Sequence, residues 1–156
     1  MNGLLNISKI LLLGLLALLL TGIVRKNVHE ADFNQVAAEV LAELDSEKVQ
    51  QGDERLLRRL YGLNGDELEN WVLCLAVDNM DVEELLLLEV KSGEEADQAY
   101  KAAEKRIEIQ KKNFEGYGPE QLQLIEKNVL RVEEPYLLFV ISEDSEAVKA
   151  AFLKSL

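Results

Sequence analysis

Two pairs of β-type runs, each joined by a short turn, restrict the fold of this chain more than any other feature. The first pair is 70–77 (N-W-V-L-C-L-A-V) and 84–91 (E-L-L-L-L-E-V-K), separated by the turn signal D-N-M-D. The second pair is 129–133 and 136–141, which meet at a Glu-Pro step. Strands joined by tight turns pair in an antiparallel manner. The sequence therefore predicts an antiparallel sheet of about four strands, although the four consecutive leucines of the second run would also suit a helix.

Helical periodicity surrounds these runs. Residues 31–44 repeat apolar side chains at the helical period, and Asp32 is suited to cap that helix. Further helices are predicted at 53–61, 94–114, 119–127 and 145–155. The resulting order, α-α-β-β-α-α-β-β-α, contains two α-α-β-β units and suggests a weak internal repeat. We expect a single α+β domain over residues 31–156, with the helices packed on one face of the sheet.

A glycine-rich corner, N-F-E-G-Y-G-P-E-Q at 113–121, separates two of these helices. Gly116 can take the left-handed conformation that ends the long helix, Gly118 can cap the next one, and Pro119 suits its first position. The buried stripe of the long helix contains one polar residue, Gln110. The corner is therefore interpreted as a junction between helices rather than a loop that cradles a ligand.

The N-terminal segment is apolar and separate from the rest. Residues 10–24, from Ile10 through Leu16 to Val24, are uncharged and nearly all apolar. This length is typical of a signal-peptide core, and with flanking apolar residues it approaches a membrane span. L-T-G at 20–22 has the form of a lipobox, but Ile23 stands where the lipid-carrying cysteine would be. We expect residues 1–26 to be a signal peptide or, preferably, a retained membrane anchor, followed by a polar spacer at 27–30.

The charge of the chain argues against nucleic-acid partners. Residues 1–26 hold three basic side chains and no acid, so residues 27–156 carry 14 basic against 29 acidic side chains, a net charge of −15. A surface this acidic repels phosphate backbones. The single cysteine, Cys74, lies in an apolar run, which predicts a small buried hydrophobe rather than a reactive thiol.

Few residues are candidates for chemistry. The only histidine, His29, lies in the spacer, which disfavours serine or cysteine triads. Asp78, Asp81 and Glu83 cluster carboxylates in the first turn and are weak candidates for a surface metal site, but their spacing does not fit a calcium loop. The preferred interpretation of this cluster is a solvated turn. No cofactor signature is present, and no cofactor is expected.

Two other groups have a structural and a functional interpretation. Arg55, Arg58 and Arg59 form a basic spot that could bind an anion, although pairing with neighbouring carboxylates is preferred in so acidic a chain. Four aromatic residues could line a groove but more often belong to the core. These are Trp71, Phe114, Tyr117 and Tyr136.

Several motifs together resemble a bacterial domain-of-unknown-function family, number 4358. They are L-T-G at 20–22, A-D-F-x-x-V-A-x-x-V at 31–40, L-x-x-L-Y-G-L at 57–63, D-N-M-D-V-E-E-L at 78–85 and P-Y-L-L-F-V-I-S-E-D at 135–144. The resemblance covers 31–156 and implies a small, exported, lipoprotein-like protein. It implies no active-site residue, and Ile23 departs from the lipidated pattern.

Two functions are consistent with these observations. The preferred one is a membrane-tethered or exported interaction or accessory module on the extracytoplasmic side, without catalytic activity and with a protein or envelope partner. The alternative is a small carboxylate-dependent enzyme that acts on cell-wall or glycan material. Only the acid-rich surface motivates the alternative, because no pair of the 29 acidic residues is singled out.

Overall fold

The computed structural model describes residues 31–156, of which Asp32–Leu156 form one compact unit. The expected anchor, with Ile10, Leu16 and Val24, and the spacer with His29 lie outside the described residues. Among residues 31–156, no helix combines the length and the apolar character needed to cross a membrane.

The core of the domain is a five-stranded antiparallel sheet in the order β1-β2-β3-β5-β4. The strands are β1 (Val49–Gln51), β2 (Asn70–Ala76), β3 (Glu84–Glu89), β4 (Val129–Glu133) and β5 (Tyr136–Ile141). The α+β class, the antiparallel pairing and both predicted strand pairs are confirmed. Sequence analysis missed β1, which is short and carries two glutamines, so it shows neither an apolar run nor alternation.

Helices occupy nearly the predicted positions. Asp32 caps the first helix, where its carboxylate accepts hydrogen bonds from the backbone N–H groups of Asn34 and Gln35. Gly62 ends the second helix in the left-handed conformation, at φ 70°. The helical segments are α2 (Phe33–Ala42), α3 (Glu54–Tyr61), the 3-10 turn η1 (Gly65–Glu67), α4 (Gly93–Phe114), α5 (Pro119–Glu126) and α6 (Ser145–Ser155).

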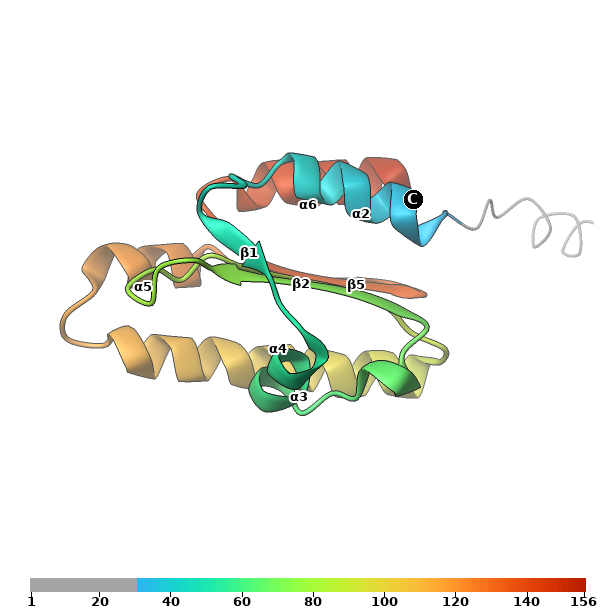
Figure 1. Cartoon of the computed structure of the whole chain (residues 1–156), viewed down its shortest axis with the longest axis horizontal. Coiled ribbons are helices and arrows are strands. Elements are labelled where there is room, and N and C mark those ends of the chain that lie inside the picture. The colour runs from blue at the N-terminus through green and yellow to red at the C-terminus, as the bar shows by residue number, and fades with distance from the viewer. Residues whose placement is uncertain (1–30) are drawn as a thin grey trace, which may run out of the picture. The chain divides into compact units, whose positions relative to one another are not determined.

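The helices cover both faces of the sheet, so the expectation that they pack on one face is wrong. Figure 1 shows α2 and α6 on one side and α3 and α4 on the other. The reason is the composition of the central strands, since every residue of β5 and the first five residues of β3 are buried. A strand that is apolar on both faces needs a cover on each.

Alternation along the central strands divides the core into two halves. Leu86, Leu88 and Phe139 belong to the cluster that packs against α3 and α4, where the ring of Tyr61 meets Phe139 edge-on at 6.3 Å. The residues of opposite parity face α2 and α6, where Phe33 stacks on Tyr136 at 6.4 Å. The alternation of side chains along β3 and β5 therefore decides which residues belong to each half of the core.

The glycine-rich corner is a helix junction, as predicted. Gly116 has φ 88°, Gly118 is the N-cap of α5, and Pro119 is its first residue. The backbone N–H of Gly118 bonds to the Phe114 carbonyl at 3.1 Å, which turns the chain tightly between α4 and α5. This junction places Phe114 and Tyr117 at one end of the cleft described next.

Candidate functional site

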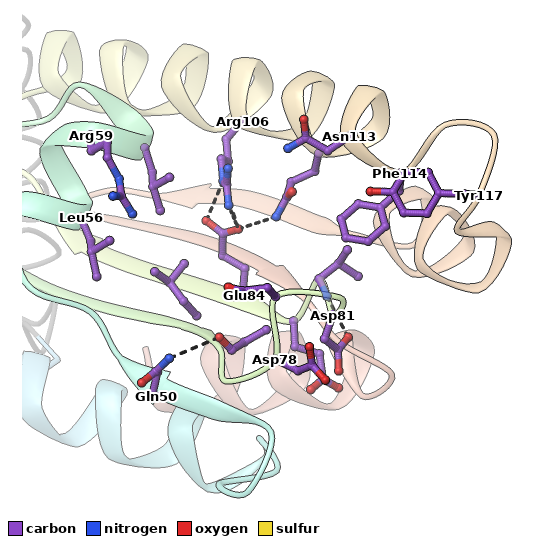
Figure 2. Close-up of a pocket in the computed structure, with 17 residues that line it drawn as sticks. Gln50, Leu56, Arg59, Asp78, Asp81, Glu84, Arg106, Asn113, Phe114 and Tyr117 are labelled. Carbon is purple, nitrogen blue, oxygen red and sulfur yellow. Dashed lines mark hydrogen bonds and ion pairs between the residues drawn. The ribbon is translucent and has the colours of Figure 1, made fainter.

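A cleft of about 500 Å³ opens on the α3/α4 face of the sheet. Its walls come from α3, from the C-terminal half of α4 and from the turn between β2 and β3 (Figure 2). The lining mixes apolar side chains with charged and amide side chains. Small-molecule sites are usually clefts of this size toward which a few polar groups point.

A buried carboxylate, Glu84, forms the floor of the cleft. It is the first residue of β3, and that strand lies between β2 and β5 at the centre of the sheet. Its side chain is 1% exposed and accepts bonds from the Tyr61 hydroxyl at 2.5 Å, from Arg106 Nε at 3.0 Å and Nη2 at 2.8 Å, and from Gln110 Nε2 at 3.0 Å. Both carboxylate oxygens are thus engaged, as a buried charge requires.

The partners of Glu84 come from two helices. Arg106 and Gln110 are four residues apart on α4 and therefore share one helix face, whereas Tyr61 is the last residue of α3. Burial and the negative charge of Glu84 raise the pKa of Tyr61 well above its usual value. Burial opposes the charge on Arg106, but its bonds to Glu84 outweigh that effect and raise its pKa. The network therefore holds a charged pair beneath the cleft.

Sequence analysis identified only one member of this network as unusual. Gln110 was recognised as the polar residue in an apolar stripe, and it is buried there because its amide donates to Glu84. Glu84 and Arg106 were not singled out. The available signal was a carboxylate at the start of an otherwise apolar central strand, which has to find a buried partner.

The acidic turn supplies one rim of the cleft. Asp78 Oδ1 accepts a bond from the Met80 N–H at 2.8 Å, and Asp81 Oδ1 accepts one from the Val82 N–H at 2.7 Å. These are the capped turn carboxylates that the sequence predicted. Asp78, Asp81 and Glu83 all line the cleft, but no set of three or more His, Cys, Asp or Glu side chains in residues 31–156 is arranged to hold a metal ion.

Glu83 differs from the other two carboxylates of the turn. Its side chain is 5% exposed, and Oε1 pairs with Lys48 Nζ at 3.3 Å, while Oε2 has no hydrogen-bond partner within the described domain. Burial raises the pKa of Glu83 despite the opposing effect of Lys48. The hydrogen bond from Lys48 to Glu83 in turn raises the pKa of Lys48. Lys48 precedes β1, in a segment where the sequence predicted no element.

The basic spot on α3 is divided between ion pairs and the cleft. Arg55 pairs with Asp53 at 2.9 Å and Arg58 with Glu54 at 2.8 Å, which confirms the preferred interpretation for these two residues. The guanidinium of Arg59 makes no ion pair or hydrogen bond with any group of residues 31–156, and Arg59 lines the cleft. Figure 2 shows Arg59, from α3, and Asn113, from α4, at the same cleft as Arg106.

The aromatic residues separate into core and rim. Tyr136 and Phe114 are buried, as the preferred interpretation predicted, and Trp71 is half-buried. Tyr117 is 60% exposed, with its ring 5.7 Å from that of Phe114 at the end of the cleft (Figure 2). Cys74 is buried, and burial raises the pKa of its thiol, in agreement with a structural role.

Comparison with known proteins gives one match. Residues 42–142 match the model of the family described as Domain of unknown function (DUF4358). No curated protein and no solved structure matches the chain. The matched stretch contains every residue that lines the cleft, whereas nearly all of α2 and all of α6 lie outside it. The chain therefore belongs to the DUF4358 family, as its motifs suggested.

Proposed function

We propose that this protein is a membrane-anchored or exported bacterial protein whose α+β domain acts outside the cytoplasm as a non-catalytic interaction module. The apolar run at 10–24 supports the membrane association, and the acidic composition disfavours nucleic acid as a partner. The cleft on the α3/α4 face is the surface that receives the partner.

The main support for this proposal is that the carboxylate at the floor of the cleft is fully bonded, whereas groups at the mouth of the cleft have unused hydrogen-bonding capacity within residues 31–156. Glu84, the most deeply buried of its carboxylates, already accepts bonds from three side chains, so it is held rigidly and is not poised for proton transfer. Among the described residues, the groups at the mouth with unused hydrogen-bonding capacity are the guanidinium of Arg59 and the Oδ2 atoms of Asp78 and Asp81. Tyr117 adds an exposed aromatic ring. Such groups recognise a ligand without having to transform it.

The membrane part of the proposal is tested by the mass of the mature N-terminus, combined with cell fractionation. We expect an intact chain of 156 residues in the membrane fraction, with residues 31–156 accessible to protease added outside the cytoplasm. A chain that loses about residues 1–26 and is secreted would keep the extracytoplasmic location and remove the anchor. A purely cytosolic product would contradict the proposal.

The binding part is tested by capture of envelope components with residues 27–156 as bait. The matched variant is Arg59→Gln, because Arg59 faces the cleft and makes no contact that supports the fold. We expect the wild-type bait to retain a specific component that the variant releases. Equal retention by both baits would show that the cleft is not the binding surface.

One observation favours the alternative, a carboxylate-dependent hydrolase. Glu83 lines the cleft, burial raises its pKa, and its Oε2 has no partner in the described domain, which are properties of a general acid. Asp81 in the same turn would then serve as the second carboxylate. Turnover of cell-wall fragments or glycans by the protein, abolished by Glu83→Gln, would establish this function in place of the first.

A further inference from the structure

We infer that the cleft binds a small zwitterion of the amino-acid or short-peptide class, with its carboxylate at Arg59 and Arg106 and its ammonium group at Asp78 and Asp81. The inference rests on the proposed function, because it names the ligand class of the same cleft. It follows, within the described domain, from the unpaired charge of Arg59 and the unused Nη1 of Arg106 at one end of the cleft, and from the unused Oδ2 atoms of Asp78 and Asp81 at the other.

The cationic end is formed by donors that the fold leaves unused. Arg59 has no partner within residues 31–156, although the other two arginines of α3 are paired and the residues after position 26 carry a net charge of −15. Arg106 binds Glu84 through Nε and Nη2, so its Nη1 makes no bond within the described domain. The amide of Asn113 is exposed and also unbonded there. A carboxylate is planar and matches a guanidinium fork, so it is the anion that fits these donors best.

The anionic end is formed by Asp78 and Asp81. Each uses Oδ1 to accept a backbone N–H of its own turn, and neither Oδ2 has a partner among the described residues. Figure 2 shows both carboxylates on the turn between β2 and β3, away from Arg59 and on the opposite wall of the cleft. An anion without a positive group would be repelled from this rim, whereas a zwitterion is attracted at both ends.

The size and the apolar part of the lining set the remaining chemistry. About 500 Å³ is suited to a ligand of one or two amino-acid residues. Leu56, Leu60, Leu75 and Phe114 also line the cleft and offer apolar contact to a ligand. A short peptide with one small apolar side chain satisfies all three parts of the lining.

The inference is tested by calorimetric titration of the full chain in detergent with three probes. The probes are the dipeptide alanyl-leucine, its C-terminal amide and its N-acetyl form. Because the amide lacks the carboxylate and the N-acetyl form lacks the ammonium group, we expect each to bind at least about tenfold more weakly than alanyl-leucine. Inorganic phosphate, a free anion, is expected to bind more weakly still.

Two variants test which side chain binds the carboxylate of the ligand and which binds its ammonium group. Arg59→Gln should weaken alanyl-leucine binding about tenfold and leave the affinity for the amide unchanged. Asp78→Asn should weaken alanyl-leucine binding and leave the affinity for the N-acetyl form unchanged. Arg58→Gln is the matched control, because Arg58 is on the same helix but does not line the cleft, and it should bind all three probes as the wild type does.

The outcomes separate this inference from the proposed function. Equal affinity for alanyl-leucine and its amide, or no heat up to ~10 mM of any probe, would overturn the inference. An Arg59→Gln variant no weaker than Arg58→Gln would overturn it as well. If the wild-type bait nevertheless captures an envelope component through the cleft, the proposed function stands without the zwitterion. If the protein is cytosolic and its binding depends on the ligand carboxylate, the inference is supported and the proposed extracytoplasmic location is wrong.

Discussion

The two faces of the sheet are built by the same strands but differ in chemistry. Toward α2 and α6, the interface consists of apolar and aromatic side chains such as Phe33, Val36 and Phe152. Toward α3 and α4, the interface contains a buried ion pair, Glu84 with Arg106, and opens into a polar cleft. Within residues 31–156, the polar and charged groups that line the cleft therefore lie on the α3/α4 face.

We propose that this difference separates stability from recognition. Replacing a buried ion pair with apolar residues is often neutral or stabilising, so the Glu84–Arg106 pair is not needed to pack a helix stably on a sheet. On the α2/α6 face, apolar side chains do this instead. The family match includes the cleft and leaves out nearly all of the two helices of the apolar face.

The largest effect is expected from a cavity in the apolar face. Phe152→Ala removes a fully buried ring of α6 and should lower the free energy of unfolding by about 4 kcal/mol, measured by urea denaturation. Leu153→Ala is the control, because the Leu153 side chain, next to Phe152 in the sequence, is 43% exposed. This change should alter the free energy of unfolding by less than about 0.5 kcal/mol. Calorimetric affinity for alanyl-leucine should survive Phe152→Ala at temperatures where the variant is folded. Loss of affinity there would show that the two faces are coupled.

Removing one partner of the buried ion pair should lower the free energy of unfolding somewhat less than Phe152→Ala does. Arg106→Leu leaves Glu84 buried without its main partner, and we expect a loss of about 3 kcal/mol in urea denaturation. The double change Glu84→Gln with Arg106→Leu should recover at least about half of that loss, because no uncompensated charge remains and the new amide oxygen can still accept bonds from Tyr61 and Gln110. A double variant as unstable as the single one would mean that the pair itself, rather than its balance of charge, stabilises the α3/α4 face.

A smaller effect is expected at the end of the cleft. Gly116→Ala places a side chain at φ 88°, where the added Cβ meets no atom within 4 Å, so the cost is backbone strain alone. We expect about 1 kcal/mol by urea denaturation, with Glu115→Ala as a nearly neutral control. If Gly116→Ala left stability unchanged and abolished binding of the dipeptide, the corner would be part of the ligand site rather than a helix junction.

The smallest effect is a pH dependence at Glu83. The folded protein raises the pKa of this carboxyl, so the native state binds its proton more tightly than the unfolded state does. Stability from this group is therefore greatest at low pH and falls as pH rises from about 4.3, the ordinary value for glutamate, through the raised pKa. Relative to the wild type, Glu83→Gln should gain stability over that window in urea denaturation at successive pH values. A relative loss with rising pH would mean that the Lys48 ion pair outweighs burial.

Much of the fold was predictable because local signals were strong. The strands at 129–133 and 136–141 and the helix at 145–155 have the predicted bounds, since each combines a clear period with a turn or breaker residue. The cover on the second face of the sheet was not predicted, although the continuous apolar run of 85–88 indicates a strand that is buried on both faces. β1 was missed because pairing with β2, rather than local sequence, makes it a strand.

The candidate site was predicted only in fragments. Gln110, Arg59 and the acidic turn were each noticed, but nothing in the sequence placed them around one cleft. Glu84 has no local signal that marks it as a site residue, because its partners are 22 to 26 residues away on other elements. Long-range side-chain pairing of this kind leaves no periodic signal in a single sequence.

Amide NMR of the isotope-labelled protein titrated with alanyl-leucine shows whether recognition belongs to the α3/α4 face or to the α2/α6 face. We expect chemical-shift changes in α3, in the C-terminal half of α4 and in the turn at 78–83, with α2 and α6 unchanged. Changes concentrated in α2 and α6, or none at saturating dipeptide, would contradict this expectation.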